Sequence, residues 1–234
     1  MYRLTDDLVF PHPTNATEDG LLAVGGDLST ERLILAYQNG IFPWYNDDDP
    51  IIWWSPNPRC VLFTDKIKVS KSMQTLFRKN AFTVTLDQNF KQVMFECKDI
   101  LRHGQGGTWI NTDMQEAYLE LHKFGFAHSV EVWGDTGLVG GLYGVFIGNC
   151  FFGESMFAKQ SNASKYGFIT LVKALNKAGV ELIDCQTTTL HLLSLGAEEI
   201  DRNDFLEYLD NNCSSEFTQE SWGKVEIEFN GKNC

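Results

Sequence analysis

The 234-residue sequence lacks several features that would each define a class of protein. It has no apolar run long enough to cross a bilayer, and its first residues, MYRLTDDLVF, lack the basic-then-apolar layout of a signal peptide. Its six cysteines include no Cys-x-x-Cys pair, so neither structural zinc nor a disulfide framework is expected. We therefore expect a cytoplasmic protein with reduced thiols, no membrane attachment and no metal.

Motifs of several common catalysts are also missing. The sequence contains no Gly-x-Ser-x-Gly elbow, no P-loop and no complete Gly-x-Gly-x-x-Gly, and its five histidines have no zinc-ligand spacing. The paired glycines at 25–26 and 140–141 are more typical of turns or close packing than of phosphate binding. The chain therefore shows no obvious covalent catalyst, although a nucleophile built from Cys185 and a distant histidine remains an alternative.

Basic residues are few, with 19 Lys and Arg against 31 Asp and Glu, which gives a net charge of −12. This balance argues against a general nucleic-acid binder. One stretch differs, because residues 59–105 hold nine basic and four acidic side chains, whereas 1–58 and 196–234 each carry a net charge of −7. The basic stretch is either a docking strip for an anionic partner or an ordinary solvated face.

Hydrophobic residues make up 43% of the chain, which is enough for a globular core. Ser29 is positioned to cap a helix over 30–38 that ends at Gly40. Residues 40–59 contain four prolines and are expected to form an irregular loop, without a long helix or a central strand. We predict a domain boundary near Pro58, with a small domain over 1–58 and a larger one over 59–234.

The larger region mixes helical and strand patterns, which predicts an α+β sheet with helices packed on it. Thr112-x-x-Gln115 is a capping-box pattern. Gly-containing turns between the strand patterns of 128–157 favour an antiparallel meander, and the acidic tail after 211 is expected to be peripheral. Helices are predicted over 71–79, 89–101, 112–125 and 163–178, and strands over 82–86, 128–133, 138–148, 150–157 and 180–186.

Polar residues in two strands are the candidates for chemistry. Glu154 lies in an otherwise apolar strand, and Asp184 and Gln186 are two residues apart near the end of another, so they should share one face. The acid could then fix the amide, whose carbonyl oxygen could accept a hydrogen bond from an attacking amine. The alternative is that Asp184 and Gln186 only cap the strand end.

Two tryptophans are the candidates for nucleotide stacking. Trp109 lies in GGTWI, where glycines expose the backbone, and Trp44 follows a Phe-Pro pair in a predicted loop. Rings in such loops can stack on an unpaired base. The alternative is that both belong to the core.

Ten strings, in order along the chain, resemble the bacterial leucyl/phenylalanyl-tRNA–protein transferase family. They are GLLAVGGDLS (20–29), GIFPWY (40–45), WWSPNPR (53–59), GTWI (107–110), AHSVEVW (127–133), LVGGLYGV (138–145), FFGESMF (151–157), SNASK (161–165), LIDCQ (182–186) and LGAEEI (195–200). The resemblance implies transfer of leucine or phenylalanine, and also methionine, from aminoacyl-tRNA to the α-amine of proteins that begin with Arg or Lys. The product would be marked for N-end-rule degradation.

The family's fold is a small N-terminal domain followed by a domain of the N-acetyltransferase (GNAT) type. Enzymes of that type that use acetyl-CoA need a glycine-rich loop, and here the corresponding junction reads AKQSNASK. The resemblance therefore implies no acetyl-CoA and no other cofactor. An aminoacyl ester is already activated, so an amine can attack it without an enzyme nucleophile.

The resemblance also implies roles for individual residues. Gln186 would accept a hydrogen bond from the amine, Asp184 would position it, and Glu154 would line the pocket. The residues implied to bind substrate are Trp44 and Trp109 for the terminal adenosine, Leu142 and Met156 for the amino-acid side chain, and Lys71, Arg78 and Lys79 for the tRNA. Because Gln74 and Thr75 replace residues that are often basic in relatives, the tRNA contact is either weaker here or shifted to Lys66, Lys68 and Lys91.

Two rival functions stay open on the sequence. One is another N-acyltransferase, using acetyl-CoA or adding amino acids to cell-wall peptides. The other is a tRNA-binding module without catalysis. Retention on a CoA resin would indicate the first, and equal binding of charged and uncharged tRNA would indicate the second.

Overall fold

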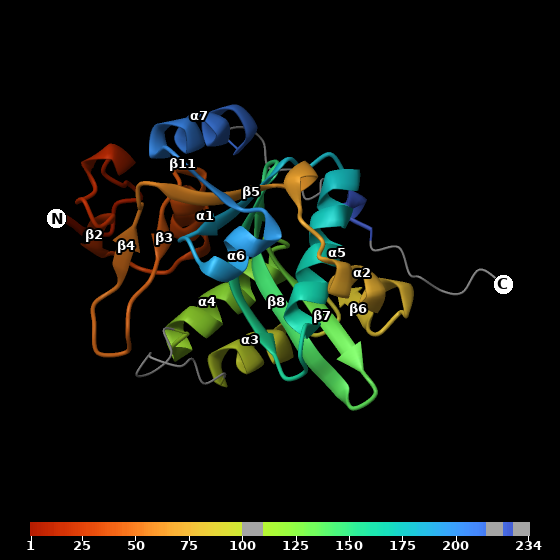
Figure 1. Cartoon of the computed structure of the whole chain (residues 1–234). Coiled ribbons are helices and arrows are strands. Elements are labelled where there is room, and N and C mark those ends of the chain that lie inside the picture. The colour runs from red at the N-terminus through yellow and green to blue at the C-terminus, as the bar shows by residue number, and fades with distance from the viewer. Residues whose placement is uncertain (100–109, 214–221, 227–234) are drawn as a thin grey trace.

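The computed structural model describes residues 1–99, 110–213 and 222–226, and the described strands form two sheets (Figure 1). The smaller sheet has the order β1-β2-β4-β3 and lies at the end of the molecule that holds the N-terminus. Its strands are β1 (Tyr2–Leu4), β2 (Leu21–Gly25), β3 (Phe42–Pro43) and β4 (Ile52–Trp54).

The larger sheet has the order β11-β5-β10-β9-β8-β7-β6. Neighbouring strands are antiparallel except β9 and β10, which are parallel because α5 (Ala163–Lys177) connects them. The strands are β5 (Arg59–Phe63), β6 (Thr83–Leu86), β7 (Ala127–Gly134), β8 (Gly137–Ile147), β9 (Cys150–Ala158), β10 (Leu182–Gln186) and β11 (Glu198–Ile200).

Helices cover both faces of this sheet, which explains why its central strands are apolar on both sides. On β8, Tyr143 and Val145 join the core shared with α1 (Thr30–Gln38), α3 (Phe90–Asp99) and α4 (Thr112–Lys123). Leu142 and Phe146 alternate with them and join the core shared with α5 and α2 (Lys71–Arg78). The remaining helices are α6 (Leu190–Leu195) and α7 (Arg202–Cys213), with short 3₁₀ turns at Pro13–Asn15, Thr64–Lys66 and Trp222–Lys224.

Gly140 on β8 lets α5 approach the sheet closely. A Cβ atom at this position would lie 2.7 Å from Cβ of Ala163, the first residue of α5. The glycine pair at 140–141 therefore serves close packing, as its sequence suggested.

The mixed α+β class and the antiparallel order of β7, β8 and β9 are confirmed. The expectation of no central strand in 40–59 is wrong, because β4 pairs with both β2 and β3. Pro43 lies in the edge strand β3, where a proline is tolerated, and the other three prolines lie outside the strands, so β4 can pair on both sides. The strands β1, β2, β5 and β11 and the helices α6 and α7 were not predicted, because they are too short or too polar to show a clear period.

The capping box at Thr112-x-x-Gln115 is also wrong. The cap of α4 is Asn111, whose Oδ1 accepts a hydrogen bond from the main-chain nitrogen of Met114 at 2.8 Å. Asn is as good a cap as Thr, and shifting the cap by one residue places Gln115 where it donates to the carbonyl of Asn111. The division into domains at residue 58 stays a prediction.

Candidate active site

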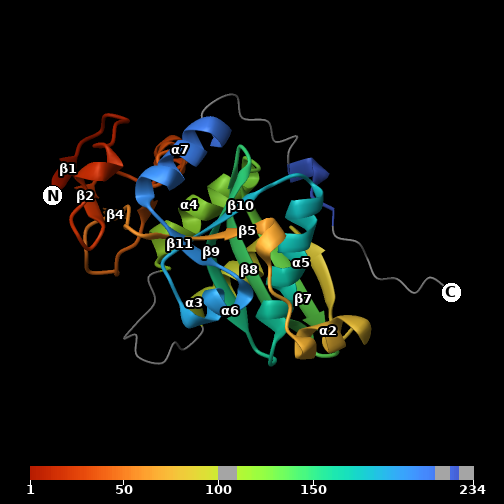
Figure 2. The ribbon, with the colours of Figure 1, turned by 45° about the horizontal axis from the view of Figure 1, so that its top comes forward.

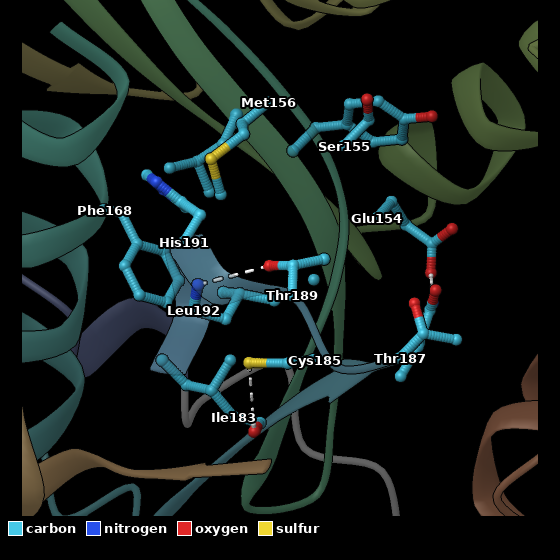
Figure 3. A pocket seen from close by; sticks show the side chains of 14 residues that line it. Glu154, Ser155, Met156, Phe168, Ile183, Cys185, Thr187, Thr189, His191 and Leu192 are labelled. Carbon is cyan, nitrogen blue, oxygen red and sulfur yellow. Dashed lines mark hydrogen bonds between the residues drawn. The ribbon is translucent and has the colours of Figure 1, made fainter. Parts of the chain in front are cut away.

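A cavity of about 300 Å³ lies where β8, β9 and β10 meet α5 and α6. Figure 2 shows α6 in front of this part of the sheet, with α5 beside it. One end of the cavity holds Met156, Phe168 and His191, and the other holds Glu154 and Thr187 (Figure 3). The apolar part of the lining consists of Leu142, Met156, Phe168, Ile183 and Leu192. A largely apolar cavity with a few polar groups, here His191 at one end and Glu154 at the other (Figure 3), is the usual form of a small-ligand site.

Glu154 on β9 accepts hydrogen bonds from three other elements. Its Oε1 accepts from Tyr37 Oη on α1 and from Gln186 Nε2 on β10, each at 2.8 Å. Its Oε2 accepts from Tyr118 Oη on α4 at 3.1 Å. The two tyrosine hydroxyls also contact each other. Because each carries a single proton, they cannot both donate to Glu154 and also hydrogen-bond to each other. Residues from widely separated parts of the chain thus fix one carboxylate.

Burial raises the pKa of Glu154 to about 7, although the hydrogen bonds from Tyr37, Tyr118 and Gln186 act in the opposite direction. Burial and the charge of Glu154 raise the pKa values of Tyr37 and Tyr118 well above the usual range. Both tyrosines therefore stay protonated near neutral pH and remain donors. Glu154 is a carboxylate that can take up and release a proton near neutral pH.

Gln186 has an unusual backbone conformation, with φ of 62° in the left-handed region. The main-chain nitrogen of Thr187 donates to the carbonyl of Cys185 at 2.7 Å, which closes a three-residue turn centred on Gln186. The register between β5 and β10 shifts between Asp184 and Gln186. Such strained conformations are concentrated at functional sites.

Asp184 is completely buried and does not line the cavity. Its Oδ1 and Oδ2 accept from Arg59 Nε and Nη2 at 2.8 and 2.7 Å, and Oδ1 also accepts from the main-chain nitrogen of Gln186 at 2.9 Å. The Arg59 guanidinium lies near the rings of Phe42 and Phe205, at 4.9 and 4.8 Å from their centroids. Asp184 thus fixes the backbone of Gln186.

This arrangement differs from the expected pairing of the Asp184 carboxylate with the Gln186 amide. The Asp184 carboxylate accepts from Arg59 and from the main-chain nitrogen of Gln186. The amide of Gln186 pairs with Glu154 instead.

The structure brings Glu154, Gln186, Leu142 and Met156 together around one cavity. Trp44 is 41% exposed, follows β3 in the smaller sheet, and packs against Trp54 with ring centroids 5.9 Å apart. Within the described part of the chain, it is not among the residues lining the cavity. Trp109 lies outside the described residues.

The predicted tRNA-binding residues lie on or next to α2. Lys71, Arg78 and Lys79 are exposed, while Met73 on the same helix is buried and Phe77 stacks on Tyr166 with centroids 4.0 Å apart. One side of α2 therefore holds the helix to the protein and leaves its basic side chains in solvent. Of the alternative lysines, Lys66 is engaged by Glu198 at 2.5 Å.

Sequence reasoning missed Tyr37, Tyr118 and Arg59. The two tyrosines lie on apolar helix faces, where an aromatic ring is expected to be an ordinary core residue. Arg59 follows a proline-rich segment, where an exposed side chain is expected. Only the fold shows that their polar ends meet Glu154 and Asp184.

Two features are absent from the described residues. No helix there is both long and apolar enough to cross a membrane. Across the same residues, no cluster of three or more His, Cys, Asp or Glu side chains could hold a metal ion.

A family model described as leucyl/phenylalanyl-tRNA protein transferase matches residues 61–210, and a model of that transferase's N-terminal domain matches 26–57. The chain belongs to the leucyl/phenylalanyl-tRNA–protein transferase family. The resemblance seen in the sequence strings is therefore confirmed, and the protein is an aminoacyltransferase.

Similar proteins carry the same family name. A leucyl/phenylalanyl-tRNA–protein transferase of Flavobacterium johnsoniae is 56% identical over 89% of this chain and 99% of its own length. One from Syntrophus aciditrophicus is 58% identical over 85% of this chain and 83% of its own. Among solved structures, L-PGS from Bacillus licheniformis matches with a TM-score of 0.40 and 11% identity, over 72% of this chain and 53% of that one.

Proposed function

We propose that this protein transfers leucine or phenylalanine, and also methionine, from aminoacyl-tRNA to the N-terminal α-amine of proteins that begin with Arg or Lys. The observation that carries the proposal is the cavity in which apolar walls lead to the hydrogen-bonded pair of Glu154 and Gln186. An aminoacyl ester needs such a combination, an apolar site for its side chain and polar groups beside its reacting carbonyl. In the cell the product would enter N-end-rule degradation in the cytoplasm.

The donor's side chain would occupy the apolar end of the cavity, against Leu142 and Met156. Hydrophobic walls select by filling and shape, so one methylene changes discrimination by only about 1–3 kcal/mol. Unbranched methionine should therefore be accepted, whereas valine and alanine should be poor donors.

The attacking amine would lie beside Gln186. Because the amide nitrogen of Gln186 donates to Glu154, its carbonyl oxygen lies on the other side of the amide group, where it can accept a hydrogen bond from the amine. A free α-amine has a pKa of about 7.7–8.0, so part of it is neutral near pH 7. Its nitrogen attacks the ester carbonyl, the ester C–O bond breaks, and the tRNA 3′ end leaves as a hydroxyl.

The proton lost by the amine must reach that leaving oxygen. Glu154 is suited to carry it, because its pKa of about 7 lies close to the working pH. Asp184 does not face the cavity and would act by positioning Gln186 through its main chain. The enzyme's main contribution would be to hold ester and amine together, which can supply several kcal/mol.

The remaining substrate contacts extend outward from the cavity. Trp44 and Trp109 would hold the terminal adenosine by stacking. Lys71, Arg78 and Lys79, exposed on α2 or at its end, would contact tRNA phosphates and make this acidic protein locally attractive to RNA.

We also propose that residues 59–234 form a GNAT-type domain and that 1–58 form a separate N-terminal domain. The support is the single parallel pair, β9 and β10, in an otherwise antiparallel sheet, with α5 crossing between the two strands.

The test is transfer of labelled phenylalanine from phenylalanyl-tRNA to a peptide that begins with arginine. The expected product is a Phe-Arg peptide, absent when the peptide's α-amine is acetylated. Gln186→Ala should slow transfer by about 10²–10⁴-fold. Gln92→Ala is a matched control, since Gln92 also donates to a glutamate, Glu96 at 2.7 Å, but does so on α3, away from the cavity. Equal transfer by both variants would contradict the proposed site.

A further inference from the structure

Two cysteines meet across neighbouring strands beside the cavity. Cys60 on β5 pairs in register with Gln186 on β10, and Cys185 is the bulged residue between Asp184 and Gln186. The thiols of Cys60 and Cys185 are close enough to influence each other's ionisation. We propose that these two thiols form a reversible disulfide that turns off transfer.

Their placement permits such a bond. Adjacent strands lie about 4.7–4.9 Å apart, and disulfides join residues whose Cα atoms are about 4.4–6.8 Å apart. Cys60 is fully buried, but Cys185 is only partly buried and lines the cavity, between its apolar and polar ends (Figure 3). A small oxidant that enters the cavity therefore meets the pair, whereas the described cysteines 97, 150 and 213 are buried and do not line it.

Access divides the roles of the two sulfurs. Cys185 lines the cavity, whereas Cys60 is fully buried and does not line it. Cys185 is therefore the thiol that an oxidant in the cavity meets first. The neighbouring Cys60 and burial raise the pKa of Cys185 well above the usual range, so its oxidation should be faster at higher pH, because the thiolate is the form that reacts.

Hydrogen peroxide is an oxidant small enough for this route. The Cys185 thiolate, at the cavity, attacks one peroxide oxygen and the O–O bond breaks, leaving a sulfenic acid on Cys185 and a hydroxide that takes a proton to become water. The Cys60 sulfur then attacks the Cys185 sulfur, the S–O bond breaks, and the hydroxyl leaves as a second water with the Cys60 proton. The two sulfurs together lose two electrons, and one peroxide is reduced to two waters.

The Cys60–Cys185 disulfide would affect the site by moving the main chain at Gln186. Cys185 directly precedes Gln186 in the tight turn, so drawing Cys185 toward β5 moves the amide that Glu154 holds. A displacement of about 1 Å in an active site can cost about 10²-fold in rate. This step rests on the proposed function, whereas formation of the bond does not.

The experiment oxidises the full-length protein with hydrogen peroxide, blocks remaining thiols by alkylation and digests with trypsin. The expected product is peptide 60–66 joined to peptide 178–202, with a mass two hydrogens below the sum of the free peptides, and each peptide contains one cysteine. Transfer should fall by about 10²-fold and return on reduction with dithiothreitol. The comparison of oxidised and reduced wild-type protein needs no variant.

Two variants sharpen the test. Cys60→Ser should keep its transfer activity after peroxide treatment, because no bridge can form. Cys213→Ala, a change at a buried cysteine on α7, should remain as sensitive as the wild type. Oxidation without the joined peptide overturns the proposal, and so does the joined peptide with unchanged transfer. If the reduced protein transfers nothing, the proposed function is contradicted, and so is its control by oxidation. The presence or absence of the joined peptide still shows whether the disulfide forms.

Discussion

Glu154 is held by two opposing influences whose balance sets its proton affinity. Burial favours the neutral acid, and three hydrogen-bond donors favour the carboxylate. Since burial prevails and the pKa rises to about 7, the folded protein keeps a proton that the unfolded chain has already lost. This residue therefore makes stability depend on pH.

The sign of that dependence follows from linkage. The ordinary pKa of glutamate is 4.5, so between pH 4.5 and about 7 the folded state binds more protons and the free energy of unfolding falls as pH rises. We expect Glu154→Gln to remove this loss of stability. The free energy of unfolding of the variant, relative to that of the wild type, should therefore be higher at pH 8 than at pH 5, by up to about 3 kcal/mol. Urea unfolding at both pH values measures the difference. If the variant and the wild type differed by the same free energy of unfolding at both pH values, Glu154 would have the same pKa in the folded and unfolded states.

Asp184 and Gln186 are close in sequence but should respond differently to substitution. Asp184→Ala leaves the buried Arg59 without its partner, which costs about 3–5 kcal/mol of stability. Gln186→Ala removes one hydrogen bond to Glu154 and leaves no buried charge without a partner, because Tyr37 and Tyr118 still contact Glu154. Transfer should therefore be slowed strongly, while the unfolding midpoint changes less than in Asp184→Ala. Thermal unfolding and single-turnover transfer, measured on both variants, separate the roles. Equal destabilisation by the two substitutions would argue that Gln186 is structural.

Among the elements, α2 carries or adjoins the three basic residues proposed to contact tRNA. Replacing Lys71, Arg78 and Lys79 together with glutamine should weaken binding of charged tRNA and reduce the salt slope by about 0.7–0.9 for each phosphate that is no longer neutralised. Transfer from a short aminoacyl-adenosine, which does not reach α2, should be retained. Lys123→Gln, an exposed change on α4, serves as control. A salt slope equal to that of wild type would place the tRNA elsewhere.

The long periodic elements could be predicted from sequence, and the short ones could not. The patterns of α5 and of β7 to β9 specify their type because each repeats over several residues. β4 has three residues and α6 has six, too few to show a period, and their place depends on neighbours. Contacts between elements also could not be predicted. Glu154 and Gln186 were predicted as site residues, but the hydrogen bond between their side chains was not. Pairing required the turn at Gln186, which strand alternation does not anticipate.

At the scale of the whole molecule, both matched regions of the chain, residues 26–57 and 61–210, contribute residues to one site. Tyr37 comes from the segment before residue 58, and its hydroxyl reaches Glu154 on β9. Tyr37, Trp53 and Phe152 also belong to the same buried core, so the N-terminal segment and the larger sheet share apolar contacts. The N-terminal segment thus contributes a donor to the carboxylate as well as packing.

This arrangement predicts that the hydroxyl of Tyr37, in the N-terminal segment, influences the pH dependence of transfer. Tyr37→Phe removes a hydrogen bond that lowers the pKa of Glu154, so that pKa should rise above its present value of about 7. A hydrogen bond to a charged group is worth about 1.5–3 kcal/mol, so a shift of about one pH unit is expected. The acid limb of the kcat/KM profile should move upward by that amount, with little loss of activity at pH 9.

Tyr118→Phe should move the profile in the same direction, since Tyr118 donates to the other carboxylate oxygen. Tyr45→Phe is the matched control, because the hydroxyl of that buried tyrosine lies in the N-terminal segment and makes no hydrogen bond to Glu154. The same peptide acceptor must be used throughout, so that titration of its own amine cancels. If Tyr37→Phe lowered activity equally at all pH values, the hydroxyl would serve packing alone, and the N-terminal segment would not control proton transfer.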